Sequence, residues 1–385
     1  MKVPTITLTG DPYAMGLAHG KAMARQIAAY TAERVALAGS SAWTGRDSSR
    51  TELLDLATAC LELHEQRFPR LVEELAGVAA GSGTGVAELL IAGGFTDFVD
   101  AVAAIDDVPG PGEFSATPEP GRTAVRAAIE HEIDDCTAFL VPAGRMALEA
   151  GTAAGALAQT WDMHEGSAEH LVLLEGRPDA APDFIVYTTA GCVGMIGINE
   201  AGVSVGINNL MAADGGVGLT WPFVVRAMLE QESAEEAMKV LLSVPLAGGH
   251  NYLVLAADGS GMNIEAMPTR RHATRLTDAP LVHANHCLAP ETQALERERL
   301  PASMNNSVAR QADAERLLDA PHLTVDDLKA VTADQASICR VGVAPTFVGT
   351  CGAVVMLPAT RELWVVGGRP SEGEYRRLAL ASRAA

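Results

Sequence analysis

The residue best suited to chemistry is Cys136, in the segment EHEIDDCTAF at residues 130–139. It stands where a helical first third gives way to short alternating segments, after a loop rich in proline and glycine. A thiol at the start of a strand behind such a loop is well placed to become a new chain end if the Asp135–Cys136 bond breaks. An isolated cysteine is more often a small buried hydrophobe, so Cys136 alone leaves both interpretations open.

A second candidate nucleophile is Ser204, because residues 202–206 read GVSVG and fit the GxSxG motif of serine hydrolases. Asp258 and His286 follow it in the order that α/β-hydrolases use. That motif requires a sharp turn from a strand into a helix, whereas Ser204 lies inside alternating sequence. A serine hydrolase is therefore the weaker alternative.

His283, His286 and Cys287 form a cluster of side chains that can bind metals. Residues on one strand and its end do not converge easily on one ion, and no acidic residue has ligand spacing with them. We expect no metal here, and a structural or pocket-lining role instead.

The elements that must position these residues change character near residue 130. The first third is helical after a short strand at 5–9, and Asp11-Pro12 has the residues of a helix start. Residues 108–122 are rich in proline and glycine and predict a loop, after which the apolar period becomes two and predicts a large antiparallel sheet system. Helices are expected from Asp11 to about 38, at 51–68, 71–81, 221–231, from 233, and at about 292–302, 308–319 and 325–333, and the last strands at 350–358 and 362–368.

This order of elements predicts an α+β fold in which two stacked sheets are covered by helical layers. The chain has 385 residues, enough to bury a sizeable core. Its 28 basic and 48 acidic side chains give a net charge of −20, which disfavours nucleic acid and anionic membranes as partners. Six separated cysteines without a CxxC pair and the lack of a signal-like or membrane-spanning stretch predict a cytoplasmic protein.

Several motifs, in the same order along the chain, resemble the acyl-coenzyme A:6-aminopenicillanic acid acyltransferase family of cysteine N-terminal nucleophile hydrolases. Each motif alone is weak, and their common order over most of the chain carries the resemblance. They are GDPYAMGLAHG at 10–20, CTA at 136–138, QTWD at 159–162, NEAGV at 199–203, GIN at 206–208, HNY at 250–252, ANH at 284–286, SICR at 337–340 and GGRP at 367–370.

The resemblance implies a four-layer αββα sandwich with an N-terminal helical module. It also implies autoproteolysis into residues 1–135 and 136–385, which stay associated as one folded unit. Cys136 would then supply both the nucleophile and the base, because a free α-amine titrates near ~7.7–8.0. The residue before the nucleophile is commonly glycine in this family and is Asp135 here, which is a departure from the family pattern at the bond to be cleaved.

Matching positions imply the remaining site residues. Asp162 would orient the Cys136 amine, Asn285 would donate to the oxyanion with Asn208 as a second candidate, and Arg340 would add positive charge near the nucleophile. Trp161, Ser337 and His286 are the expected substrate-binding residues.

The resemblance implies a small N-acyl or aminoacyl amide as substrate, with acyl-coenzyme A as one conceivable acyl donor, and neither cofactor nor metal. A homo-oligomer is a further expectation. The sequence leaves open whether water or an amine resolves the thioester. It also leaves open a non-catalytic binding protein that never cleaves itself.

Overall fold

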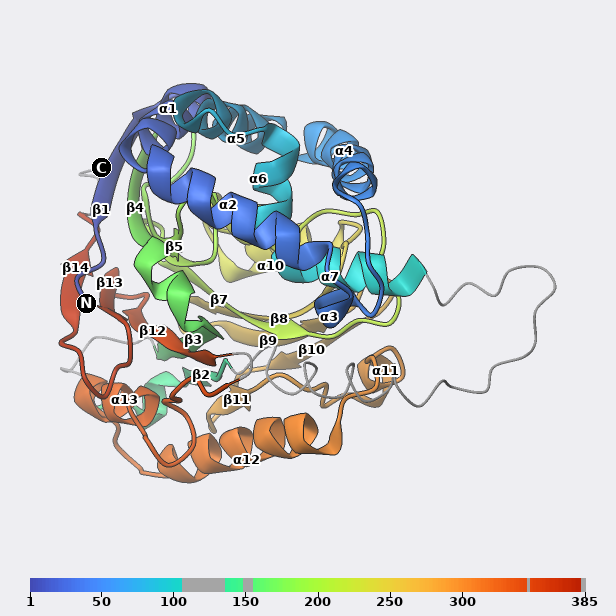
Figure 1. Cartoon of the computed structure of the whole chain (residues 1–385). Coiled ribbons are helices and arrows are strands. Elements are labelled where there is room, and N and C mark those ends of the chain that lie inside the picture. Colours follow the sequence, from blue (N-terminus) through green and yellow to red (C-terminus); the bar gives the residue numbers. More distant parts are fainter. Residues whose placement is uncertain (106–135, 148–154, 345–346, 382–385) are drawn as a thin grey trace.

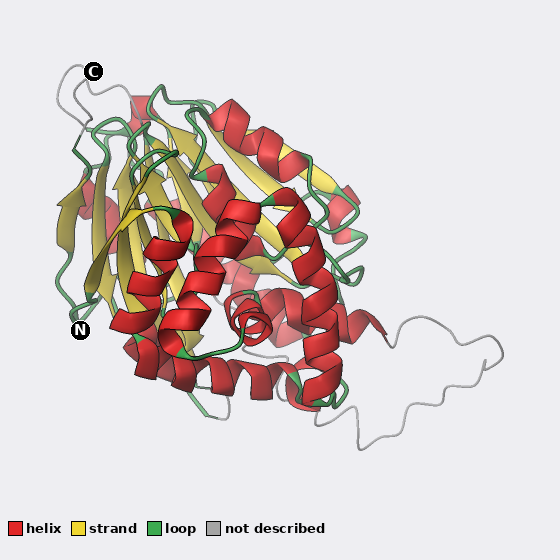
Figure 2. Ribbon diagram, turned by 90° about the horizontal axis from the view of Figure 1, so that it is seen from above, coloured by secondary structure: helices red, strands yellow, loops and turns green. Residues whose placement is uncertain are grey.

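Two β-sheets lie face to face in the computed structural model, and helices cover the outer face of each (Figure 1). The structure describes residues 1–105, 136–147, 155–344 and 347–381. The helices of the first 105 residues lie on one side of the sheets, and α12 (Pro301–Leu317) and α13 (Val325–Thr332) lie on the other. Figure 2 shows from above how a layer of helices lies over the strands. The α+β sandwich expected from the sequence is therefore confirmed.

The first 105 residues form one strand and the helices that follow it. Asp11 caps the first helix through a 2.8 Å hydrogen bond that its Oδ1 accepts from Ala14 N, as the Asp-Pro pair predicts. The single helix expected up to residue 38 is instead two helices, because Met23, with φ of −121°, lies outside helical geometry. The elements are β1 (Thr5–Gly10), α1 (Pro12–Ala22), α2 (Ala24–Ala38), α3 (Ser41–Thr44), α4 (Arg50–Arg67), α5 (Pro69–Ser82), α6 (Val86–Gly93) and α7 (Phe95–Ala104).

Helices α1 and α5 cross with their backbones in contact. Gly16 and Gly20 on α1 face Gly77 and Gly81 on α5, and a Cβ atom on any of the four would overlap backbone atoms of the other helix. Only glycine allows so close an approach. These glycines therefore set the close spacing between α1 and α5 in the N-terminal layer.

The larger sheet has the strand order β1-β4-β5-β6-β7-β8-β9-β10. Neighbouring strands are antiparallel, except that β1 pairs with β4 in parallel and so joins the N-terminal residues to the later part of the chain. The strands after β1 are β4 (Leu171–Pro178), β5 (Phe184–Thr189), β6 (Ile196–Asn199), β7 (Val203–Leu210), β8 (Gly249–Ala256), β9 (Gly261–Ala266) and β10 (Arg271–Arg275).

The smaller sheet has the order β11-β2-β3-β12-β13-β14 and is antiparallel throughout. Ala138 on the first of its strands along the chain pairs with Gln159 on the next. The strands are β2 (Ala138–Val141), β3 (Ala156–His164), β11 (Leu281–His283), β12 (Val348–Leu357), β13 (Glu362–Gly367) and β14 (Arg376–Ala379).

The bounds of the later helices agree only partly with those predicted from the sequence. The helices expected at 292–302 and 308–319 are wrong in their bounds, because proline starts a helix more readily than it continues one. Pro290 begins a four-residue helix, and Pro301 begins α12, which runs without interruption to Leu317. The other helices on this part of the chain are α9 (Trp221–Met228), α10 (Ala234–Leu242) and α11 (Pro290–Gln293).

Gln159 connects the two sheets. Its Nε2 donates to Ile207 O at 3.0 Å and its Oε1 accepts from Ile207 N at 2.8 Å. The amide fits because Gly206 leaves room for it: a Cβ there would lie 2.6 Å from Gln159 Oε1. The bond pair therefore holds β3, which carries Asp162, in a fixed position against β7.

Buried polar contacts join the N-terminal helices to the rest of the chain. Asp97 on α7 accepts from Trp221 N at 2.9 Å, and Asp100 accepts from Ala212 N at 3.0 Å and Gly249 N at 3.1 Å. Within the described residues, no single helix is long and apolar enough to cross a membrane; only the bent pair of α5 and α6 meets the length and composition required.

Candidate active site

Cys136 lies just before β2 with its sulfur against the backbone of β3. Its side chain is 5% exposed, and Sγ lies 3.4 Å from Asp162 N and 3.9 Å from Asp162 O. Thr137 N donates to Thr160 Oγ1 at 3.1 Å, and Thr160 N donates to Thr137 O at 2.9 Å, so the pairing of β2 with β3 continues up to the nucleophile. Asp135, the expected residue before the cleaved bond, lies outside the described residues.

Asp162 turns its carboxyl group toward the layer of α12. It is fully buried, and neither carboxyl oxygen has a hydrogen-bond partner among the described residues. Burial raises its pKa to about 7, while the positive charge of Arg310 and the nearby hydroxyl groups of Thr350 and Thr160 act in the opposite direction. A buried acceptor without a donor, beside the backbone that holds the sulfur, is suited to receive a newly formed amine.

Arg310, in the middle of α12, connects the groups around Cys136. It is 1% exposed, and its NH1 donates to Cys136 O at 2.7 Å and to Thr137 Oγ1 at 3.0 Å, while NH2 donates to Asn285 Oδ1 at 3.0 Å. Its Nε donates to Asn306 Oδ1 at 2.8 Å. Arg310 lies outside every motif considered in the sequence.

Arg310 also fixes the orientation of the Asn285 amide. Because a guanidinium only donates, the Asn285 atom that faces it must be the oxygen. The Asn285 Nδ2 then points the other way and donates to Asn209 O at 3.1 Å, while Asn285 N donates to Ser307 Oγ at 2.8 Å. The structure thus brings Cys136, Asp162 and Asn285 together around one buried arginine.

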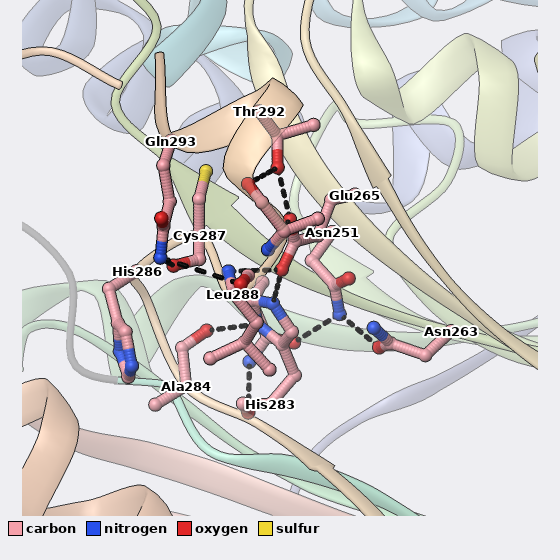
Figure 3. A network of polar contacts seen from close by, with 12 residues as sticks. Asn251, Asn263, Glu265, His283, Ala284, His286, Cys287, Leu288, Thr292 and Gln293 are labelled. Atoms are coloured by element: carbon pink, nitrogen blue, oxygen red, sulfur yellow. Dashed lines mark hydrogen bonds and ion pairs between the residues drawn. The ribbon is translucent and has the colours of Figure 1, made fainter. Parts of the chain in front are cut away.

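Asn208 is engaged in a separate network. Its Nδ2 donates to His283 O at 3.3 Å, and its Oδ1 accepts from Asn251 Nδ2 at 3.3 Å. Figure 3 shows the neighbouring contacts, including the 2.7 Å bond from Asn251 to Asn263. None of the hydrogen bonds described for Asn208 connects it to Cys136, so its expected oxyanion role stays a prediction.

Glu265 organises the His283–Cys287 segment. It accepts from His283 Nε2 at 2.9 Å, from Leu288 N at 2.6 Å and from the Thr292 hydroxyl (Figure 3). Burial alone would raise the pKa of Glu265, but these hydrogen bonds and the charge of His283 lower it to about 2. Its contacts give His283 a structural role. Among the described residues, no three His, Cys, Asp or Glu side chains are arranged to hold a metal ion.

The expected substrate-binding residues lie in different places. His286 Nδ1 contacts Ser307 Oγ at 2.8 Å, and burial lowers the His286 pKa to about 4. Ser337 Oγ donates to Asp334 at 3.2 Å and, with Arg340, lines a cavity of about 460 Å³ that Arg310 also reaches.

Arg340 is connected to the site through Thr350. Arg340 N donates to Thr350 Oγ1 at 2.9 Å, and Thr350 pairs with Asp162 across β12 and β3. Trp161 lies on the opposite face of β3 from Asp162, where it lines a small cavity beneath α2 and α7.

Ser204 does not have the surroundings of a nucleophile. It is buried near the start of β7, and its hydroxyl donates to Leu255 O at 2.9 Å. Asp258 is exposed and accepts from Ser260 N, and His286 contacts Ser307. The turn from strand to helix that GxSxG requires is absent at this described position.

Comparisons with known proteins identify the family. The family profile of acyl-coenzyme A:6-aminopenicillanic acid acyl-transferase matches residues 148–372, a range that begins after Cys136. The 40 kDa form of acyl-coenzyme A:6-aminopenicillanic-acid-acyltransferase from Emericella nidulans is 24% identical over 342 residues, covering 87% of this chain and 84% of the relative.

Solved structures show fainter likeness. Penicillin V acylase from Agrobacterium tumefaciens is 12% identical with a TM-score of 0.32, covering 61% of this chain and 77% of its own. A mutant of conjugated bile acid hydrolase from Clostridium perfringens is 10% identical with a TM-score of 0.35, covering 65% and 92%.

Proposed function

Because the chain belongs to the acyl-coenzyme A:6-aminopenicillanic acid acyl-transferase family, it is an acyltransferase or amide-bond hydrolase, and we propose that it works through a thioester on Cys136. One observation carries the proposal. The Cys136 sulfur lies 3.4 Å from Asp162 N, and Arg310 joins the Cys136 carbonyl to Asn285. A nucleophile, a buried acid and an amide donor are the parts that acyl transfer needs.

Activation begins with self-cleavage. The Cys136 thiol attacks the carbonyl carbon of Asp135, the carbon–nitrogen bond breaks, and the acyl group moves from nitrogen to sulfur. The nitrogen takes up the proton and becomes the α-amine of Cys136. Water then hydrolyses the thioester, which leaves residue 135 with a free carboxylate and restores the thiol.

Turnover uses the same sulfur. The α-amine accepts the thiol proton as the sulfur attacks the substrate amide, and the resulting ammonium protonates the leaving amine. The acyl group stays on Cys136 as a thioester. Attack by water gives hydrolysis, whereas attack by a second amine gives transfer.

Each neighbouring residue has one task. Asp162 accepts a hydrogen bond from the Cys136 amine, and Asn285 Nδ2 donates to the oxyanion. Arg310 is a positioning residue that keeps Asn285 Oδ1 turned away from the reacting carbon. Arg340 contributes positive charge from the far side of Thr350, and Asn208 is a second oxyanion donor if its bond to His283 O is exchanged.

The family and the relative's name support a proposal for the substrate class. We propose a small N-acyl or aminoacyl amide, with an acyl-coenzyme A as one acyl donor. After cleavage the fragments stay associated, which is supported by the parallel pairing of β1 with β4 and by the buried bonds of Asp97 and Asp100. A cytoplasmic location is part of the same proposal.

Trapping of the acyl-enzyme tests this function. The purified protein is incubated with p-nitrophenyl butyrate, quenched with acid and analysed by mass spectrometry under denaturing conditions. We expect one butyryl group on the fragment that begins at Cys136, its loss in Cys136→Ala and its retention in Ser204→Ala. A label on another residue, or no label at all, contradicts the proposal, and the second result favours a binding protein.

A further inference from the structure

A small cavity lies on the face of the smaller sheet toward which Cys136 points. The register that pairs Ala138 with Gln159 places Cys136 opposite Trp161 two residues further on, and paired residues share a face. Trp161 and Met163 line this cavity together with Tyr30 and Arg34 of α2, Phe95 of α7 and Trp221 of α9. Its volume is about 30 Å³. That is enough for a group of roughly two or three atoms, since a water needs about 10–15 Å³.

The cavity contains a buried cation whose hydrogen-bond acceptors are neutral. Arg34 is fully buried, and its guanidinium contacts Met163 Sδ at 3.4 Å, His164 Nδ1 at 3.2 Å and the Ser167 hydroxyl. Burial, and then the charge of Arg34, lowers the pKa of His164 to about 4, so that ring stays neutral. The guanidinium also lies 4.7 Å from the centre of the Tyr30 ring and 5.1 Å from that of Phe95.

Little negative charge compensates Arg34. Glu33 Oε1 lies 3.7 Å away on a side chain that is 44% exposed, and the described lining of the cavity contains no acidic residue. The buried carboxyl group of Asp97 accepts a hydrogen bond from Trp221 N, and burial raises its pKa well above the usual range, which disfavours its charged form. A buried cation in such surroundings favours an anion beside it.

Two N–H donors of the lining also lack an acceptor. Arg34 Nε and Trp221 Nε1 are buried without a hydrogen-bond partner among the described residues. A carboxylate accepts several hydrogen bonds and matches a guanidinium, and the aromatic walls suit the carbon atoms that carry it.

We propose that this cavity, formed by Arg34, Trp221 and Trp161, binds a carboxylate of the substrate, so that the enzyme prefers acidic amides. The inference rests on the proposed function of Cys136 as the nucleophile, because the cavity lies on the face of the smaller sheet toward which Cys136 points. It also gives the N-terminal helices a task after cleavage, since Tyr30, Arg34 and Phe95 come from them.

Matched substrates test the proposal and show which side of the amide carries the acid. On the acyl side, glutaryl-p-nitroanilide is compared with pentanoyl-p-nitroanilide. On the amine side, N-butyrylglycine is compared with N-butyrylglycinamide. We expect the acid of one pair to have the higher kcat/KM, and Arg34→Met to lower it roughly 10- to 100-fold while the neutral partner changes less than about threefold.

Two further variants protect the test against a folding defect. Trp221→Phe keeps the ring but removes the Nε1 donor, and should lower kcat/KM several-fold for the acid only. Arg25→Met, on the exposed side of the same helix α2, should change neither substrate. A wild type without preference for either acid, or variants that lower both members of a pair equally, would overturn the proposal.

A binding measurement separates this inference from the proposed function. Glutarylanilide and pentanoylanilide are titrated by calorimetry into Cys136→Ala, with and without Arg34→Met. If glutarylanilide binds more tightly than pentanoylanilide, and Arg34→Met abolishes this difference, the carboxylate site is supported. If Cys136→Ala retains turnover, only the thioester mechanism is refuted. Equal binding of the two anilides contradicts the cavity.

Discussion

Replacing Arg310 by glutamine removes the guanidinium that joins Cys136, Thr137 and Asn285. The three hydrogen bonds of 2.7 to 3.0 Å to these groups disappear together with the bond from Arg310 Nε to Asn306, and the Asn285 amide loses the donor that fixes its orientation. Loss of one oxyanion donor costs roughly 10²–10³-fold in kcat. We therefore expect Arg310→Gln to lower kcat by about that factor and to leave KM within about threefold, because the partners of Arg310 are groups of the protein.

The assay compares three variants with the wild type. Hydrolysis of a butyryl anilide is followed at saturating and limiting substrate, with rates normalised to the amount of fragment that begins at Cys136. Arg310→Lys keeps the charge and part of the hydrogen bonding, so we expect a smaller loss of roughly tenfold. Arg316→Gln is the matched control, because Arg316 is exposed on the same helix and pairs with Asp313.

The stability of each variant must be measured alongside. Breaking a buried charged network costs about 3–5 kcal/mol, so Arg310→Gln should unfold at lower urea concentration than Arg316→Gln. A kcat within threefold of the wild type would refute the positioning role. The positioning role would also be refuted if Arg310→Lys and Arg310→Gln lowered kcat/KM equally, through a higher KM with an unchanged kcat.

Three other perturbations have clear expected outcomes. In the uncleaved Cys136→Ala protein, the pKa of Asp162 is raised to about 7, whereas in the unfolded chain the pKa of this group is near 3.8. Between these two pH values the folded state keeps a proton that the unfolded state has lost. The free energy of unfolding should therefore fall by about 4 kcal/mol as the pH rises from about 4 to 7, and should stay low above pH 7. Adding Asp162→Asn should flatten that slope in urea unfolding curves, and an unchanged slope would assign it to other groups. Gln159→Leu leaves Ile207 N–H and C=O unpaired between the sheets and should cost about 2–5 kcal/mol in the same experiment, with a cost below 0.5 kcal/mol contradicting the bridge. Ser204→Ala should keep anilide hydrolysis within about threefold because its hydroxyl only donates to Leu255 O, whereas loss of activity comparable to that of Cys136→Ala would restore the serine hydrolase.

The sequence predicts the layers of this fold because periodicity and turn residues are local signals. The strands with strong alternation, such as those at 155–163 and 350–358, appear in the structure as β3 and β12. Strand β10, with the sequence RHATR, was missed because it is a polar strand at the edge of the sheet, where burial does not impose a pattern.

Only those candidate site residues that lie in family-like motifs could be proposed from the sequence. Cys136, Asp162 and Asn285 come from segments that resemble a family, and the structure brings them together. Arg310 has no such motif. Its signal lies in the buried face of α12, where Ser303, Ser307, Arg310 and Ala314 recur at helical spacing and one arginine stands among small residues.

The site features that the sequence did not predict depend on contacts between residues of different layers. The bounds of α12 had to be known before Arg310 could be placed on its inner face. Trp161 and Asp162 are adjacent in sequence but point to opposite faces of β3, so the expected substrate residues Trp161 and Ser337 do not line one cavity.

The most direct test of the account is the mass of the purified chain under denaturing conditions. We predict two species for the wild type, residues 1–135 and a fragment that begins with Cys136, and a single intact species for Cys136→Ala. An intact wild-type chain that still hydrolyses the anilide would contradict the central claim, because its Cys136 would have no free amine to act as the base.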